Sequence, residues 1–166
     1  MAMDWKMRIG FVLSMVWVCL LGAGSAQAQA SFESKHDAVV YLFPEQVSVP
    51  VGRPFPVALH FQIERGLHIN SHMPKGDFLI PTVLSIPEGA GVKLAQATYP
   101  PGEDFTLPID HKTRLSVYTG EFVIHAEIVA ERGNHMVEAK LHYQACDLNS
   151  CMPPRTITVP IDVIGK

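Results

Sequence analysis

Two cysteines near the C-terminus are the residues best suited to do chemistry. Cys146 and Cys151 flank four residues in the stretch CDLNSCMPP, which spans 146–154. If the segments on either side pair as neighbouring strands, the two Cα atoms come within disulfide range, because facing residues lie about 4.5–5.5 Å apart. A ring this small stabilises a fold by only about 2 kcal/mol, and exposed disulfides tend to be the labile ones. The pair is therefore a static bridge that pins a turn, a redox-active disulfide or part of a metal site.

The first thirty residues indicate the compartment in which these cysteines work. A basic start with Lys6 and Arg8 precedes an apolar run from Ile9 to Leu21, and small residues follow up to Ala30. This order is typical of a secretory signal peptide, and the run is shorter than the roughly 18 residues that span a bilayer. We expect cleavage after Ala28 or Ala30.

The remaining residues, 31–166, are expected to form one exported domain that is soluble and does not span a membrane. Disulfides persist outside the cytoplasm, so we expect the periplasm if the source is Gram-negative. The chain has a formal net charge of −3 and no basic block. Nucleic acids are therefore excluded as expected partners.

Alternation of apolar and polar residues with a period of two dominates residues 31–166, and no window favours an amphipathic helix. We expect seven to nine short strands and an all-β, immunoglobulin-like antiparallel β-sandwich in a single domain. The stretch from Tyr99 to Arg114, rich in proline, glycine and charge, is expected to be a long functional loop. The expected strands lie within residues 39–49, 57–63, 67–73, 82–86, 92–99, 114–118, 122–128, 137–143 and 157–163.

The residues around the cysteines resemble the N-terminal periplasmic domain of the thiol:disulfide interchange protein DsbD. The matching stretches are YQAC at 143–146 and CMPP at 151–154, and further upstream GLHINS at 66–71, FLIPT at 78–82 and VYTG at 117–120. The resemblance covers most of residues 35–164.

The resemblance implies an immunoglobulin-like domain that passes reducing equivalents from a thioredoxin-like donor to oxidised periplasmic partners. Cys146 and Cys151 would be the redox pair, and Cys151 would form the mixed disulfides. Phe105 would be the cap that shields them, because Glu103, Asp104 and Phe105 resemble the acidic-acidic-Phe cap loop of the family. More residues separate Phe105 from the VYTG stretch than in DsbD itself, so Phe105 could instead pack on one end of the sandwich.

Four further residues are candidates for tuning the cysteines. Glu103 and Asp104 could raise the pKa of a neighbouring thiol by charge repulsion or move protons, or they could simply be solvated. His68 and Asn70 stand where DsbD has tyrosines. A histidine beside a thiol could lower its pKa, whereas His68 on the solvent face of a strand would do nothing.

A metal site is a weaker alternative. His72, Met73 and His142 lie near the expected site in the sequence, but they complete no full metal-binding pattern for copper or zinc. We expect neither a metal nor an organic cofactor.

The function that we expect is thiol:disulfide exchange in the periplasm, with electron transfer through Cys146 and Cys151 to oxidised envelope proteins. Because the chain stops at Lys166, a thioredoxin-fold protein or a membrane electron transporter would supply electrons in trans. A protein-disulfide reductase activity is consistent with this function but is not specified by the sequence. The alternative is an immunoglobulin-like protein-binding module whose disulfide is purely structural.

Overall fold

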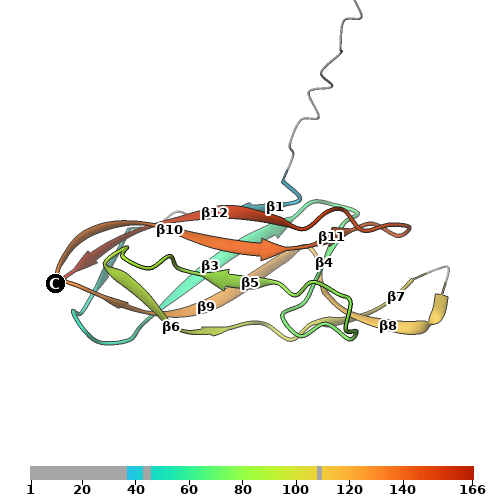
Figure 1. Cartoon of the computed structure of the whole chain (residues 1–166), viewed down its shortest axis with the longest axis horizontal. Coiled ribbons are helices and arrows are strands. Elements are labelled where there is room, and N and C mark those ends of the chain that lie inside the picture. The colour runs from blue at the N-terminus through green and yellow to red at the C-terminus, as the bar shows by residue number, and fades with distance from the viewer. Residues whose placement is uncertain (1–36, 43–45, 108–109) are drawn as a thin grey trace, which may run out of the picture. The chain divides into compact units, whose positions relative to one another are not determined.

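All regular elements in the described part of the chain are β-strands (Figure 1). The computed structural model describes residues 37–42, 46–107 and 110–166, and the side chains of 110–112 are not described. The described residues belong to one compact unit, Lys35–Lys166. The expected signal peptide, residues 1–30, lies outside the described residues, as does its expected cleavage site.

The first sheet contains four antiparallel strands in the order β1-β3-β9-β6. Its strands are β1 (Val39–Tyr41), β3 (Phe55–Ile63), β9 (Glu121–Ala130) and β6 (Val92–Thr98). The pairing of β3 with β9 places Phe61 opposite Phe122, and their rings stack with centroids 5.1 Å apart. Aromatic pairs of this kind stabilise a sheet beyond the area that they bury.

The second sheet has the order β2-β12-β10-β5. Its strands are β2 (Gln46–Val49), β12 (Arg155–Gly165), β10 (Gly133–Tyr143) and β5 (Val83–Ser85). The pairs β10–β12 and β10–β5 are antiparallel, but β2 runs parallel to β12. The prediction of an antiparallel sandwich is therefore wrong for this one edge strand, whose direction no residue pattern specifies.

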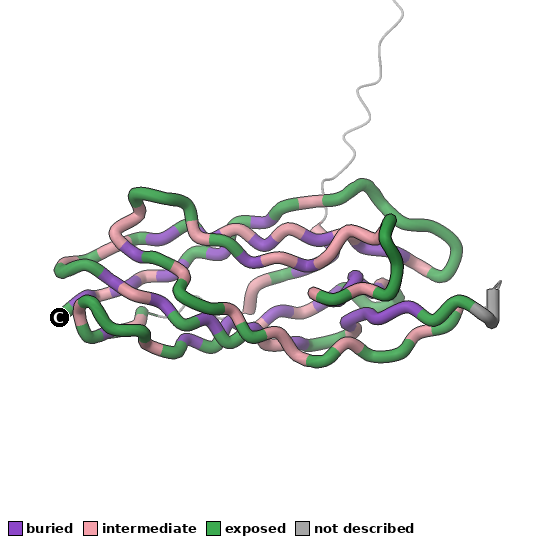
Figure 2. The backbone as a smooth tube through the Cα atoms, turned by 60° about the horizontal axis from the view of Figure 1, so that its bottom comes forward, coloured by how far each residue is buried: buried purple, intermediate pink, exposed green. Residues whose placement is uncertain are grey.

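The core lies where the inward side chains of these two sheets meet. Leu59 and Ile124 from the first sheet and Leu141 and Val159 from the second are all fully buried members of one apolar cluster. Figure 2 shows buried residues recurring along the strands between more exposed neighbours. This is the burial that period-two patterning predicts, and the predicted all-β fold is confirmed.

A third sheet positions the cysteine hairpin, with the order β11-β4-β8-β7. Its strands are β11 (Ala145–Cys146), β4 (His68–Asn70), β8 (Asp110–Tyr118) and β7 (Glu103–Leu107). Figure 1 shows β7 and β8 at the opposite end of this unit from the C-terminus.

The strand β7 corrects the prediction of one long loop from Tyr99 to Arg114. Among the described residues of this stretch, only the segment before β7, including Pro100 and Pro101, lacks regular structure, and β7 then pairs antiparallel with β8. Phe105 and Thr106 favour extended backbone. Their pairing with β8 outweighs the signals for a loop that the neighbouring proline, glycine and charged residues give.

Candidate functional site

The cysteine hairpin begins where β10 gives way to β11. Cys146 and Cys151 form a disulfide with their Cα atoms 3.9 Å apart, and they also face each other in an antiparallel bridge. The backbone N–H of Met152 donates to the carbonyl of Ala145 at 2.8 Å, and that of Asp147 donates to the carbonyl of Ser150 at 2.9 Å. The predicted pairing of the two flanking segments is therefore present, and it brings the cysteines together.

Asp147 organises the four residues between the cysteines. Its Oδ1 accepts the backbone N–H groups of Asn149 and Ser150, both at 2.7 Å. These two hydrogen bonds hold the pKa of the Asp147 carboxyl below its usual value, against a smaller opposing effect of desolvation. The hairpin therefore carries a fixed negative charge beside the disulfide.

The two cysteines differ in their access to solvent. Cys146 is only 2% exposed, whereas Cys151 is exposed. Leu148 and Met152, which lie close to Cys151 in sequence, are also exposed apolar residues. Thiol–disulfide exchange needs an incoming thiolate to reach one sulfur of the bond, so attack from solvent is directed at Cys151.

His68 is the residue of β4 that faces Cys146. The register of β4 with β11 pairs these two residues, and facing residues of an antiparallel pair project to the same side. His68 is 3% exposed, and its Nε2 atom has no hydrogen-bond partner in the structure. The alternative of a histidine on the solvent face is therefore wrong.

Burial and charge act on this imidazole in opposite directions. Desolvation lowers the pKa of His68, and the negative charge of Asp147 raises it by a smaller amount. Asp147 is thus the acid that acts on His68. It is a residue of the site that sequence reasoning missed, although an Asp followed by Asn149 and Ser150 is a recognisable pattern for an Asx-type turn.

Phe105 covers His68 from the side of β7. The two rings are tilted by 35° with their centroids 4.5 Å apart. Phe105, His68 and the hairpin residue Leu148 line one pocket of about 460 Å³. The structure therefore brings Phe105 to the neighbourhood of the cysteine hairpin, while its role as a movable cap stays a prediction.

The acids beside Phe105 have partners away from the cysteines. Glu103 accepts a hydrogen bond at 2.9 Å from the hydroxyl of Thr119. Asp104 forms ion pairs with Lys75 and, at 3.7 Å, with Arg114. Lys75 is the main reason that the pKa of Asp104 lies below its usual value. Much of the negative charge of Asp104 is therefore compensated locally.

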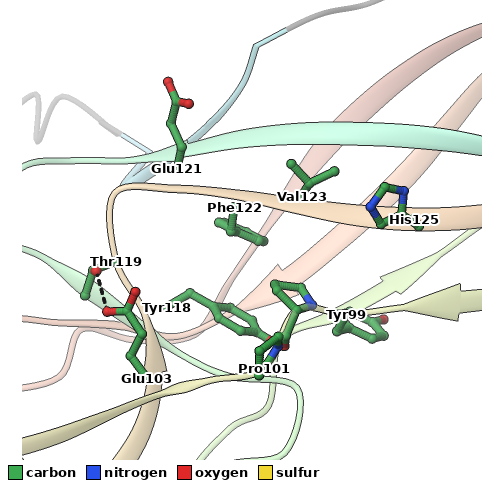
Figure 3. A pocket seen from close by; sticks show the side chains of 10 residues that line it. Tyr99, Pro101, Glu103, Tyr118, Thr119, Glu121, Phe122, Val123 and His125 are labelled. Carbon is green, nitrogen blue, oxygen red and sulfur yellow. Dashed lines mark hydrogen bonds between the residues drawn. The ribbon is translucent and has the colours of Figure 1, made fainter.

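Figure 3 shows where Glu103 lies, at the rim of a different pocket of about 350 Å³. Tyr99, Tyr118, Phe122 and His125 are among its other lining residues. Neither cysteine nor His68 lines it. The chemistry of the disulfide therefore lies outside this pocket.

Asn70 connects β4 with the cysteine hairpin. Its side-chain Nδ2 donates to the carbonyl of Ile80 at 3.0 Å and to Oε1 of Gln144 at 3.4 Å. Gln144 in turn donates from Nε2 to the carbonyl of Met152 at 3.1 Å. Asn70 is buried, so in the structure it supports the hairpin through Gln144.

The histidines considered for a metal site have other contacts. His72 stacks on Tyr99 with ring centroids 3.8 Å apart, and His142 is hydrogen-bonded to the hydroxyl of Thr156 at 3.0 Å. Among the described residues, no group of three or more His, Cys, Asp or Glu side chains is arranged to hold a metal ion. The same residues contain no helix that is long and apolar enough to cross a membrane.

Comparison with known proteins identifies the family. A crystal structure of the Neisseria meningitidis DsbD N-terminal domain in the reduced form is similar, with 20% sequence identity and a TM-score of 0.46; the match covers 65% of this chain and 77% of that one. No curated protein matches the chain. The family model described as "Thiol:disulfide interchange protein DsbD, N-terminal" matches residues 38–162. Because that match covers most of the chain and spans both cysteines, His68 and Phe105, the chain belongs to the family of DsbD N-terminal domains.

Proposed function

We propose that this chain is a periplasmic thiol:disulfide exchange domain that passes reducing equivalents through Cys146 and Cys151. The observation that carries the proposal is the unequal burial of a bonded pair at a hairpin tip, with Cys151 exposed and Cys146 buried. Membership of the DsbD N-terminal family supports it. The electron donor is a thioredoxin-fold protein or a membrane electron transporter, and the acceptors are oxidised envelope proteins.

Transfer to an acceptor takes two exchanges. The Cys151 thiolate attacks one sulfur of the acceptor disulfide, which forms a mixed disulfide and releases the other acceptor sulfur as a thiolate. Cys146 then attacks the Cys151 sulfur and displaces the first acceptor sulfur. The acceptor gains two electrons, the cysteine pair is oxidised to a disulfide, and a donor dithiol reverses the change by attack on Cys151.

Phe105 acts as the lid of this site. Its ring packs on His68, and together with Leu148 it lines the pocket beside the hairpin. Its strand β7 is paired on one side only, at the edge of the third sheet, so β7 can be displaced at lower cost than a central strand. A closed lid limits unwanted oxidation between encounters, and an open lid admits the partner sulfur.

The experiment that tests the proposal is a measurement of the reduction potential of the Cys146–Cys151 pair in graded thiol/disulfide buffers, with free thiols trapped and counted by mass. We expect a value of roughly −270 to −180 mV, between thioredoxin-like donors and disulfide isomerases. A value below about −300 mV would instead indicate a structural bridge and favour the binding module.

Two matched variants complete this test with a thioredoxin-fold reductant and an oxidised protein acceptor. Cys151→Ser should abolish transfer, because the remaining thiol is buried. Cys146→Ser should stop at a trapped mixed disulfide, visible as one covalent adduct by mass. Full turnover by Cys151→Ser would contradict the assignment of the attacking sulfur.

A further inference from the structure

The imidazole of His68 is buried, and one of its nitrogens has no hydrogen bond. It lies across from the buried cysteine, Cys146. It faces Cys146 in the register of β4 with β11, and its Nε2 atom has no partner. A buried nitrogen without a hydrogen bond is costly. When the disulfide is reduced, Cys146 becomes a thiol, and this thiol can be the hydrogen-bond partner that the buried nitrogen lacks.

We propose that His68 is the proton acceptor for Cys146 in the second exchange, the step that resolves the mixed disulfide. This inference rests on the proposed exchange function. As the Cys146 sulfur attacks the Cys151 sulfur, the Cys146 proton passes to the imidazole of His68. The new bond joins the sulfurs of Cys146 and Cys151, the bond from Cys151 to the partner breaks, and the partner sulfur leaves as a thiolate with the bonding electron pair.

The burial of Cys146 makes an internal base necessary. The nucleophile in exchange is the thiolate, but burial of a thiol disfavours its charged form and raises its pKa. Solvent hydroxide has poor access to a residue that is 2% exposed. A base within the same sheet is therefore the direct route by which Cys146 can lose its proton.

His68 is in the right protonation state for this task. Desolvation is the larger effect on its pKa and lowers it, so the neutral imidazole that accepts a proton predominates at neutral pH. Once the proton has moved, the imidazolium lies in the field of the Asp147 carboxylate, which favours the charged form. His68 thus accepts the proton, and Asp147 stabilises the resulting positive charge.

The other groups around His68 define what a pH profile can report. Asp147 approaches from the hairpin, and Phe105 from β7 carries no charge. Glu64 and Arg65, of opposite charge, come from the turn between β3 and β4 and line the same pocket. From β8, Tyr118 faces Ile69, the next residue along β4, and burial raises the pKa of its hydroxyl above its usual value. The Tyr118 hydroxyl has a raised pKa and the Asp147 carboxyl a lowered one, so neither group changes its charge near neutral pH.

The test is a rapid-mixing reaction of the reduced full-length protein with dithiobis-nitrobenzoic acid, a chromogenic disulfide that releases one coloured thiolate in each exchange. The Cys146→Ser variant defines the first phase alone. In His68→Gln we expect the first phase to stay within twofold of wild type and the second to slow by about a hundredfold or more, the lower end of the range for a general base. In wild type the rate of the second phase should also fall as the pH drops through the pKa of His68. This fall is the acid limb of the pH profile, and His68→Gln should lack it.

His142→Gln is the matched control. His142 lies on β10 with its own hydrogen bond to Thr156, and this variant should leave both phases unchanged. Circular dichroism and thermal unfolding of each variant show whether it is folded. If His68→Gln slows both phases equally, or leaves the second unchanged with its acid limb intact, the inference is wrong.

A second variant tests the inference without altering a buried residue. Asp147→Asn keeps an oxygen that can accept the Asn149 and Ser150 N–H groups, but it removes the charge that raises the pKa of His68. The acid limb of the second phase should move to lower pH, and an unmoved limb would contradict the inference. If instead the wild-type cysteines cannot be cycled between disulfide and dithiol at all, the exchange function itself has failed.

Discussion

At the residue scale, the two bonded sulfurs of the site lie in different surroundings. Cys151 shares an exposed hairpin tip with Leu148 and Met152, whereas Cys146 is enclosed by β4. An incoming thiolate therefore meets Cys151 first. Because attack at Cys151 expels Cys146 into a buried position, Cys146 is held where it can attack back before the partner escapes. In the proposed exchange, unequal burial thus makes Cys151 the sulfur that meets the partner and Cys146 the sulfur that releases it.

Phe105→Ala tests the residue that covers this arrangement. Removing the ring should open the pocket beside His68 and raise the rate at which the reduced protein is alkylated by iodoacetamide at Cys151 by several-fold. The fold should remain intact, because Phe105 is only half-buried and lies outside the main apolar cluster. The measurement is the rate of adduct formation by mass spectrometry.

Phe78→Ala is the matched control for Phe105→Ala. Phe78 is 97% exposed, so its loss should change neither alkylation nor stability. Equal alkylation rates for Phe105→Ala and wild type would show that Phe105 does not shield the cysteine.

At the element scale, the short strand β4 organises the site because it lies between β11 and β8. All three of its residues, His68, Ile69 and Asn70, are buried. Strands that are covered on both faces lose the alternation of apolar and polar residues. For that reason the sequence pattern alone left the burial of His68 undecided.

The long strands were predictable because one face of each packs on the core. In β9, and in β10 from Val137 to Tyr143, every second residue is apolar and buried, as period-two patterning requires. Strand β7 has no such pattern, since Glu103, Asp104 and Thr106 are all exposed. The direction of β2 and the proximity of Asp147 to His68 depend on tertiary pairing, so no local signal specifies them.

Gly102→Ala tests whether the close packing at Gly102 positions the β7–β8 hairpin. A methyl group at Gly102 would overlap the hydroxyl of Ser116 and lie 2.8 Å from Cβ of Ser71, whose own hydroxyl is hydrogen-bonded to that of Ser116. Such overlap forces a shift where β7 begins and should cost about 1–3 kcal/mol of unfolding free energy. It should also increase the alkylation of Cys151, because Phe105 moves with its strand. Thermal unfolding and adduct mass measure the two effects.

Gly76→Ala provides the comparison for Gly102→Ala. The nearest atom to a methyl group at Gly76 is the side-chain Cδ1 of Leu79, at 3.4 Å, so this change should be tolerated. If both alanine variants behave alike, the close approach at Gly102 does not position the hairpin.

At the scale of the whole molecule, the fold and the redox pair are separable. The apolar cluster lies mainly between the first two sheets and takes in Ile69, Tyr118 and Ala145 of the third, but neither cysteine belongs to it. The disulfide closes a short ring within one hairpin at the third sheet. A domain with this arrangement can cycle between disulfide and dithiol while its core remains packed, as an exchange domain must.

Reduction should therefore lower the free energy of unfolding by no more than about 2 kcal/mol, the loss that chain entropy predicts for so short a ring. By contrast, Leu59→Ala should cost about 2–5 kcal/mol in either redox state, because Leu59 is fully buried in the cluster and its truncation leaves a cavity. Urea unfolding of the oxidised and reduced protein, each with and without this substitution, measures both quantities. The two effects should add, since they arise in separate parts of the domain. Unfolding of the wild-type protein on reduction alone would mean that the bridge holds the fold together, and the domain would then be the binding module with a structural disulfide.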